Sequence, residues 1–300
     1  MEKAITQLPV KTLGSIRAYE AAIQHLGIRI PRLHVVLGSG IGSSFIDSWI
    51  PSDWRDAGSI PFSEIPSVSS ATAPGHAGIY RFFEEKKSKD VLCLQVGRLH
   101  GYEGLSASDT ALSVMIPRMA GTKNFILTNA AGGLKLEWPV GSVMMIRDHV
   151  NMTGQNPLLG PVMNGPDGKP IGPRFPDFSK AWDREFSESV KKELGTAGIQ
   201  TQEGTYLGIL GPNFETPAEV RLFGQWGMGT VGMSTVWEAI ALVHSGAKLS
   251  GFSLITNLGC GLNPGVVLDH FEILEASRTA AEKIVAALFA IGRREFALKA

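Results

Sequence analysis

Three polar side chains with alternating spacing follow the apolar segment Val91–Val96. They are Arg98, His100 and Tyr102, and in an extended segment they would share one face. A guanidinium, an imidazole and a phenol together suit an oxyanion, and Arg98 can donate two parallel N–H bonds to phosphate. The alternative is a surface ion-pair cluster around Glu103. Three donors beside an apolar segment favour the anion site.

Two glycine-rich motifs also follow or end apolar segments. Gly38–Gly42 (GSGIG) comes after Leu33–Leu37, and Thr128–Gly133 reads TNAAGG. Glycine lets the backbone approach a ligand and turn its N–H groups towards an anion, and Ser39 adds a hydroxyl donor. Ser43 stands where a dinucleotide-binding motif needs glycine, and no Gly-Lys-Ser/Thr follows, so neither a Rossmann cofactor site nor a Walker loop is indicated. For both motifs the alternative is a plain strand-to-helix turn.

An aromatic ring and a carboxylate are neighbours in the motif Gly211–Thr216 (GPNFET). Phe214 offers a stacking face and Glu215 an acceptor for ring N–H groups, and a purine needs both. Thr216, a following proline and Glu219 also form the pattern of a helix-capping box. Capping uses Thr216 and leaves Glu215 free, so both interpretations can hold together.

Two further motifs end predicted strands, Val231–Thr235 (VGMST) and Ile255–Leu258 (ITNL). Taken alone, Met233 is more typical of a core and Asn257 of a turn. Six polar or glycine-rich motifs at strand ends are hard to explain as six independent turns. If the strands run parallel, their ends meet at one edge of the sheet, where ligands bind in open α/β proteins. The pattern therefore predicts one composite ligand site.

Short apolar strands alternate with helical patterns along the chain, which predicts an α/β fold. Strands that are apolar throughout favour a mixed, largely parallel central β-sheet flanked by helices on both faces. No repeat and no clear linker is found, so residues 1–300 are expected to form a single domain. The predicted strands are Leu33–Leu37, Val91–Val96, Phe125–Thr128, Val143–Ile146, Thr205–Leu210, Thr230–Met233 and Leu249–Thr256. The predicted helices are Ser15–Leu26, Ser108–Met119, Pro217–Trp226, Val236–Ser245 and Asp269–Ile291.

Two long segments are rich in proline and glycine, Ile60–Gly78 and Gly154–Phe178. Loops of this length are uncommon in compact domains unless they bind something or are disordered. The second segment contains Arg174 and Phe175 and has too many aromatic residues for a solvated linker. We expect it to be an ordered surface loop that covers a site or contacts a neighbouring subunit.

The composition excludes several classes of protein. The 28 basic residues balance the 28 acidic ones, so no overall field attracts nucleic acid or a membrane surface. No segment approaches the ~20 apolar residues of a membrane span, which makes a cytoplasmic protein the default expectation. Cys93 is expected in the core, and Cys260 has no partner that would activate a thiolate. The seven histidines show no metal-ligand spacing, so no metal is expected.

At this point the motifs resemble a known family, the trimeric purine nucleoside phosphorylases. The resemblance runs from about Gly38 to His270 and rests on eight motifs in the family's order: GSGIG, PGHAG, GRLHGYEG, TNAAGG, GQNPLLGP, GPNFET, VGMSTVWE and SLITN. It implies the nucleoside phosphorylase fold, a homotrimer, and inorganic phosphate as co-substrate with no other cofactor.

The resemblance also implies a role for each matching position. Those that resemble the phosphate site are Ser39, His76, Arg98, His100, Ala130 and Ser234. Those that match ribose contacts are Tyr102, Met233, His270 and, from the adjacent subunit, Phe175. Those that match base contacts are Phe214, Glu215, Val231, Thr256 and Asn257. Asn257, His100 and Glu215 are the expected catalytic residues.

The implied activity is phosphorolysis of 6-oxopurine nucleosides such as inosine and guanosine. Family members that cleave 5′-methylthioadenosine tend to carry aspartate at the position of Asn257, and this chain has asparagine there with Glu215. A 5′-methylthioadenosine phosphorylase on the same fold is the nearest alternative. A second alternative is a hydrolase that uses water in place of phosphate, and Arg98 and His100 argue against it. A third is a non-catalytic nucleoside-binding subunit.

Overall fold

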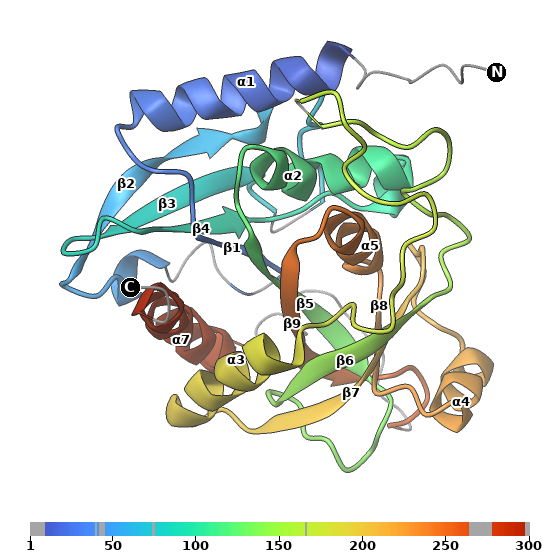
Figure 1. The fold of residues 1–300 in the computed structure, drawn as a ribbon. Helices are drawn as coiled ribbons and strands as arrows, with labels where there is room; N and C mark the ends of the chain where they lie inside the picture. Colours follow the sequence, from blue (N-terminus) through green and yellow to red (C-terminus); the bar gives the residue numbers. More distant parts are fainter. Residues whose placement is uncertain are drawn as a thin grey trace.

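The computed structural model describes residues 10–39, 41, 46–73, 76–165, 167–263 and 278–297. Figure 1 shows a twisted sheet with helices on both sides. The helices are α1 (Val10–His25), α2 (Ala107–Met119), α3 (Arg184–Thr196), α4 (Pro217–Gln225), α5 (Val236–His244) and α7 (Arg278–Ala297). The strands are β1 (Leu33–Leu37), β2 (Trp54–Pro61), β3 (Ile79–Glu85), β4 (Val91–Val96), β5 (Asn124–Gly133), β6 (Val143–Asn151), β7 (Thr201–Gly208), β8 (Thr230–Gly232) and β9 (Lys248–Leu258). Short 3-10 helices lie at Ile46–Trp49, Phe62–Glu64 and Gly101–Glu103.

The sheet is mixed, as expected, with parallel strands at its centre. Its order is β2-β3-β4-β1-β5-β8-β7-β6-β9, and β5 also pairs with β9. The pairs β1–β4, β1–β5, β5–β9, β6–β7 and β7–β8 are parallel. The pairs β2–β3, β3–β4, β5–β8 and β6–β9 are antiparallel. Strands β5, β8, β7, β6 and β9 thus form a closed ring of pairings, and β1 to β4 extend from it.

Both faces of strand β1 are buried, which explains why four of the five residues of its sequence LHVVL are apolar. Val35 belongs to the core cluster that includes Phe186 of α3 and Leu288 of α7. Its neighbour Val36 points to the opposite face and packs in the cluster with Val114 of α2 and α5 side chains. In Figure 1, α3 and α7 lie on one side of the sheet, and α2 and α5 on the other.

Strand β5 is longer than predicted, and this corrects one alternative for the TNAAGG motif. The motif lies inside β5, and the next element is the strand β6, so it is not a strand-to-helix turn. Gly132 of this motif pairs with Val231 of β8 on one side and with Asn257 of β9 on the other. The sheet register itself therefore brings three of the predicted motifs together.

Three elements were missing from the sequence-based prediction: β2, β3 and α3. Strand β2 is an edge strand with exposed charged residues and a register shift between Asp56 and Gly58, so its pattern does not alternate cleanly. Helix α3 buries Phe186, Val190 and Leu194 and exposes a largely charged face. The spacing of its apolar residues fits one helix face, but they are too few to stand out in a polar segment.

The two long proline- and glycine-rich segments have different structures. Residues 60–78 begin with the end of β2, and Phe62, Ile65 and Val68 bury their side chains there. Among the described residues of the segment 154–178, a bridge between Asn164 and Pro170 is the one strand pairing. This second segment runs over the surface, as expected. The predicted closing helix is described from Arg278, and its predicted first part, 269–277, lies outside the described residues.

Candidate active site

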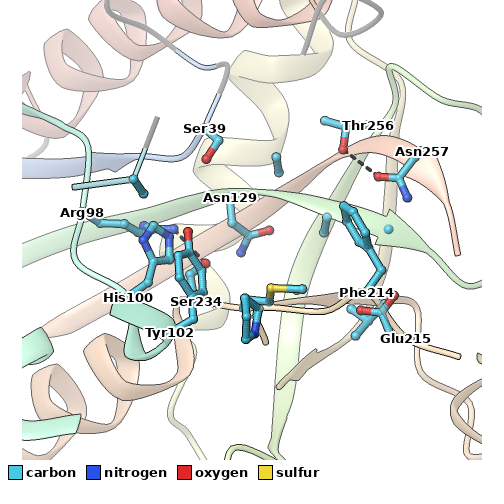
Figure 2. Close-up of a pocket in the computed structure, with 18 residues that line it drawn as sticks. Ser39, Arg98, His100, Tyr102, Asn129, Phe214, Glu215, Ser234, Thr256 and Asn257 are labelled. Atoms are coloured by element: carbon cyan, nitrogen blue, oxygen red, sulfur yellow. Dashed lines mark hydrogen bonds between the residues drawn. The ribbon is translucent and has the colours of Figure 1, made fainter. Parts of the chain in front are cut away.

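The predicted motifs meet around one cavity of about 330 Å³ (Figure 2). Its wall is built from the ends of β1, β4, β5, β8 and β9 and from the segment before α4. The lining residues are Ser39, Ala73, Arg98, His100, Tyr102, Asn129, Ala130, Ala131, Gly132, Pro212, Phe214, Glu215, Val231, Gly232, Met233, Ser234, Thr256 and Asn257. The predicted convergence on one composite site is therefore confirmed.

Two groups of side chains lie on opposite sides of the cavity in Figure 2. The first, here called the anion cluster, consists of Ser39, Arg98, His100 and Ser234. The second, here called the base cluster, consists of Phe214, Glu215, Thr256 and Asn257. The anion cluster carries hydrogen-bond donors and a permanent positive charge, whereas the base cluster carries a ring, a carboxylate and an amide. The cavity can therefore hold a ligand with an anionic end and a flat polar end.

Arg98 is the buried cation of the anion cluster. Its side chain is 1% exposed, and Nη1 donates to Oγ of Ser234 at 3.1 Å and lies 3.4 Å from Oγ1 of Thr235. Nε lies 3.2 Å from Oε1 of Glu238, which is also buried. Burial raises the pKa of Glu238, and the charge of Arg98 opposes this shift. A guanidinium fixed in this way is a strong site for an oxyanion.

Ser39 is oriented by His76, which is itself held by the backbone. The backbone N–H of Arg98 donates to Nδ1 of His76 at 3.1 Å, and Nε2 of His76 lies 2.7 Å from Oγ of Ser39. Because Nδ1 accepts, the proton of a neutral ring is on Nε2, and Nε2 donates to Ser39. The hydroxyl hydrogen of Ser39 is then available for an anion. His76 thus stands behind Ser39 and not on the cavity wall.

Gly38 allows β1 and β5 to end close to each other. A Cβ atom at this position would lie 2.5 Å from Cα of Asn129, a contact that real structures do not show. The backbone N–H of Gly38 also donates to Oγ1 of Thr128 at 3.0 Å. The first glycine of GSGIG is therefore needed for packing of the strand ends, and this packing brings Ser39 to the cavity.

The start of α5 contains a strained turn that presents Ser234. Thr235 has φ +71° and ψ −48°, and the N–H of Val236 donates to the carbonyl of Ser234 at 2.7 Å, which closes a γ-turn. Positive φ is unfavourable for a β-branched residue, and such strain persists only where neighbours impose it. Nδ2 of Asn129 donates to Oγ1 of Thr235 at 2.9 Å. Hydrogen bonds from Asn129 and from Arg98 of the anion cluster thus hold Thr235 in this turn.

His100 of the anion cluster contacts both Glu103 and Tyr102. Its Nδ1 lies 3.2 Å from Oε1 of Glu103, and its ring stacks on Tyr102 with centroids 4.6 Å apart. Burial lowers the pKa of His100, and the bond to Glu103 opposes the shift. Burial alone would raise the pKa of Glu103, but hydrogen bonds from His100 and Thr72 hold it at about 2. The contact between His100 and Glu103 thus lies within the site, with both side chains buried, and not on the surface.

The base cluster combines an exposed ring with a buried carboxylate. Phe214 is 40% exposed at the rim, and Glu215 is buried. Burial raises the pKa of Glu215. Glu215 lies just before the N-terminus of α4, where Thr216 and Glu219 form the predicted capping box. The carboxylate of Glu215 is not used for capping, so it stays free to accept from a ligand.

Asn257 is oriented by its two neighbours in β9. Oγ1 of Thr256 donates to Oδ1 of Asn257 at 3.1 Å, and Nδ2 donates to the carbonyl of Leu258 at 2.9 Å. A primary amide has two N–H donors and two acceptor lone pairs, so capacity for a ligand remains at both atoms. The amide is thus set in place before any base arrives.

His76 and Phe175 are predicted residues that do not line this cavity. Phe175 is 89% exposed and lines a separate surface cavity of about 520 Å³ together with Leu159 and Arg174. His270 lies outside the described residues. The other predicted residues, His76 apart, line the 330 Å³ cavity.

Three residues of the site were not singled out in the sequence: Asn129, Thr235 and Glu238. Asn129 and Thr235 are neighbours of predicted residues in their motifs and support them through hydrogen bonds. Glu238 is an acidic residue in the otherwise apolar start of α5 (VWEAIALVH). A lone carboxylate in a buried helix was the available signal, because burying it requires a partner.

Three further expectations concern metal ions, membrane helices and Cys93. Among the described residues, no three histidine, cysteine, aspartate or glutamate side chains are grouped so that they could hold a metal ion. None of the helices within the described ranges is long and apolar enough to cross a membrane. Cys93 is buried, as expected.

The fold and the cavity define an α/β protein with an anion-binding and a ring-binding end at one sheet edge. Residues 51–291 match the family model described as the phosphorylase superfamily. The chain is 38% identical over 275 residues to purine nucleoside phosphorylase of Mus musculus, covering 87% of this chain and 88% of the mouse protein. It is 36% identical to purine nucleoside phosphorylase 1 of Bacillus subtilis, covering 82% and 86%. The chain belongs to the purine nucleoside phosphorylases, which are pentosyltransferases.

A solved structure agrees with this assignment. The chain resembles the crystal structure of Schistosoma mansoni purine nucleoside phosphorylase in complex with adenosine, with a TM-score of 0.77 and 27% sequence identity. The match covers 95% of this chain and 98% of that one. The nucleoside phosphorylase fold is therefore confirmed.

Proposed function

We propose that the chain catalyses reversible phosphorolysis of 6-oxopurine ribonucleosides and 2′-deoxyribonucleosides, such as inosine and guanosine. The products are the free base and the pentose 1-phosphate, and inorganic phosphate is the co-substrate with no other cofactor. The observation that carries the proposal is the placement of the anion cluster and the base cluster on opposite sides of one 330 Å³ cavity. A nucleoside between them would have its glycosidic bond facing the phosphate.

The anion cluster acts by placing phosphate below the sugar. As the C1′–N9 bond breaks, positive charge develops on the ribose and negative charge on the base. A phosphate dianion held by Arg98, Ser39 and Ser234, with the backbone N–H of Ala130, stabilises that cation and then forms the new O–C1′ bond. Fixing both reactants in one cavity also removes most of the entropic cost of their encounter.

The base cluster acts on the leaving group. As the base becomes anionic, the amide N–H of Asn257 donates to O6, and the carbonyl oxygen of Asn257 accepts from the N7–H that forms when the departing base takes a proton from water. Glu215 accepts from N1–H, and from the 2-amino group of guanine. Phe214 and Val231 give the ring an apolar surface on which to stack. This pattern of donors and acceptors fits a 6-oxopurine better than a 6-aminopurine.

The sugar lies between the two clusters. Tyr102 and Met233 line this part of the cavity. His270 is proposed to orient the 5′-hydroxyl group, an assignment that rests on its motif position alone.

We also propose a homotrimer in which Phe175 of one subunit closes the ribose side of the next. The support is an aromatic ring that is 89% exposed on a long surface segment. A ring exposed to this extent gains stability when another surface covers it.

The experiment that tests the function is phosphate-dependent release of hypoxanthine from inosine. The panel should include guanosine, adenosine and 5′-methylthioadenosine, since the Schistosoma relative was solved with adenosine. Preference for 5′-methylthioadenosine would favour the nearest alternative. Turnover in phosphate-free buffer would indicate a hydrolase, and inosine binding without turnover would indicate a non-catalytic subunit.

A further inference from the structure

Arg98 and Glu238 form the most deeply buried ion pair among the described residues. Their side chains are 1% and 2% exposed, and Nε of Arg98 lies 3.2 Å from Oε1 of Glu238. The next most buried pair, His100 with Glu103, is 6% and 5% exposed and depends on the protonation of the histidine. Arg98 therefore carries a permanent charge that water cannot compensate.

The two residues form an ion pair in which the N–H of Nε does not point straight at the carboxylate. Within the described part of the chain, Nε and Nη2 of Arg98 have no hydrogen-bond acceptor, and neither carboxylate oxygen of Glu238 has a donor. Nη1, by contrast, donates to Oγ of Ser234. Nε and Nη2 are both shielded from solvent, whereas Nη1 bonds a residue that lines the cavity. Glu238 thus balances the charge of Arg98 at Nε, while Nη1 bonds Ser234 of the anion cluster.

The position of Glu238 in α5 supports this reading. The helix begins directly after the strained turn at Thr235, and the side chains of Val236, Ala239 and Ile240 around Glu238 are buried. A carboxylate that accepts no hydrogen bond in such surroundings costs stability unless an opposite charge compensates it. Arg98 provides that charge, and Glu238 provides the same for Arg98.

We propose that Glu238 is a positioning residue for phosphate: it is the resident counter-charge of Arg98 in the phosphate-free protein, and it competes with the anion for that charge. This proposal rests on the proposed function in one respect: phosphate is taken to be the anion that binds the anion cluster. When phosphate is bound, its charge and that of Glu238 are both balanced by the single charge of Arg98. The carboxylate stabilises the empty site and weakens phosphate binding, which favours release of phosphate and of the pentose phosphate product.

The test is Glu238→Gln, which keeps the side-chain shape and removes the charge. The phosphate-free variant should melt at a lower temperature than wild type, because Arg98 becomes an unpaired buried charge. Inorganic phosphate should raise its melting temperature more than that of wild type, and the half-saturating phosphate concentration should fall at least about threefold, since a ligand that compensates the charge binds the variant more tightly. The Michaelis constant for phosphate should fall relative to that for inosine.

Glu84→Gln is the matched control. Glu84 is also buried and contacts Arg55 and Lys89, but it lies on β3 away from the cavity. This control should lower the melting temperature without changing the half-saturating phosphate concentration. If Glu238→Gln behaves like Glu84→Gln, Glu238 has only a structural role and the proposal is overturned. Weaker phosphate binding by Glu238→Gln would overturn it as well.

A second comparison covers the case in which Glu238→Gln does not fold. Arg98→Met leaves Glu238 unpaired, so the double variant Arg98→Met/Glu238→Gln should be more stable than Arg98→Met alone; equal or lower stability would reject the counter-charge pair. These readouts use phosphate binding and melting temperature, not turnover. A wild-type protein that binds phosphate but does not release hypoxanthine would refute the proposed function and leave this inference open to the same test.

Discussion

The polar side chains around the cavity are positioned by one another before a ligand arrives. His76 orients Ser39, Thr256 orients Asn257, and Asn129 fixes the turn at Thr235. Such preorganisation matters because groups that are already aligned need no reorganisation as charge develops in the transition state. Single substitutions in these supports should therefore alter substrate preference or affinity more than they alter the fold.

Asn257 provides the first prediction at this scale. In the proposed binding mode, Asn257→Asp replaces the amide N–H that donates to O6 with an oxygen that accepts from a 6-amino group. We expect the ratio of kcat/KM for guanosine to that for adenosine to fall by about tenfold or more, equivalent to one lost or unpaired hydrogen bond. Steady-state kinetics with both nucleosides at saturating phosphate measure this ratio. An unchanged ratio would contradict the base-reading role of Asn257.

His34 provides a second prediction, on stability. Burial lowers the pKa of His34 from 6.5 to about 4, and a 2.9 Å contact with Gln95 opposes the shift. The unfolded chain takes up this proton near pH 6.5 and the folded chain only near pH 4. Stability that is present above pH 6.5 is therefore lost as the pH falls towards 4, by about 3 kcal/mol for this group.

Urea unfolding of wild type and His34→Gln between pH 7.5 and 4.5 measures that loss. The variant should lose less stability than wild type over this range. His25→Gln is the control, because it removes an exposed histidine at the end of α1 and keeps the buried His34. Parallel curves for wild type and His34→Gln would show that His34 does not titrate as described.

Residues of the site were predictable where their chemistry was visible in a local motif. Arg98, His100 and Tyr102 alternate after a strand, and Phe214 and Glu215 are adjacent, so residue type and spacing were informative. The contact between Arg98 and Glu238 was not predictable in this way, because it joins residues 140 positions apart. The strain at Thr235 was equally hidden, since β-branched residues rarely adopt positive φ.

At the scale of elements, the capping residue of α4 directly follows Glu215. The cap is Thr216, and the helix begins at the next residue, Pro217. Thr216 accepts from the N–H of Glu219, whose side chain accepts in return from the N–H of Thr216. This capping box fixes the direction in which the chain enters the helix. The position of Glu215 in the cavity therefore depends on the cap.

Thr216→Ala should destabilise the protein by about 1 kcal/mol, the usual cost of losing a cap. It should also raise the Michaelis constant for guanosine, because Glu215 is then less well fixed. Thr216→Ser retains the hydroxyl and should behave like wild type in both respects. Urea unfolding and steady-state kinetics on the two variants are the measurements, and equal values for alanine and serine would rule out the capping argument.

Elements were predictable where burial made the pattern uniform. Strands β1 and β4 are buried on both faces and almost entirely apolar, and they were found at their exact bounds from that feature. Strands β2 and β3 were missed because charged residues interrupt their patterns. The antiparallel pairing of the short β8 with β5 depends on long-range register, which local periodicity does not contain.

At the scale of the whole molecule, the surface cavity beside Phe175 exposes large apolar side chains that nothing in the same chain covers among the described residues. Leu159 is 75% exposed there and Phe175 89%. Arg174 lies over the ring of Phe175 and also donates to the carbonyl of Gly160, which keeps the segment together. An ordered segment that exposes two large apolar side chains suits a subunit contact better than a solvated loop.

The shared-site arrangement predicts complementation between two defective variants. Phe175→Ala subunits keep an intact cavity but give their neighbour no ring, whereas Arg98→Met subunits keep the ring but cannot bind phosphate. Each homo-oligomer should be weakly active at low inosine concentration. After joint refolding, mixed oligomers contain Phe175→Ala cavities that receive Phe175 from an Arg98→Met neighbour, so activity should recover in part. If Phe175 served its own chain, or the protein were a monomer, the mixture would show only the average of the two separate activities.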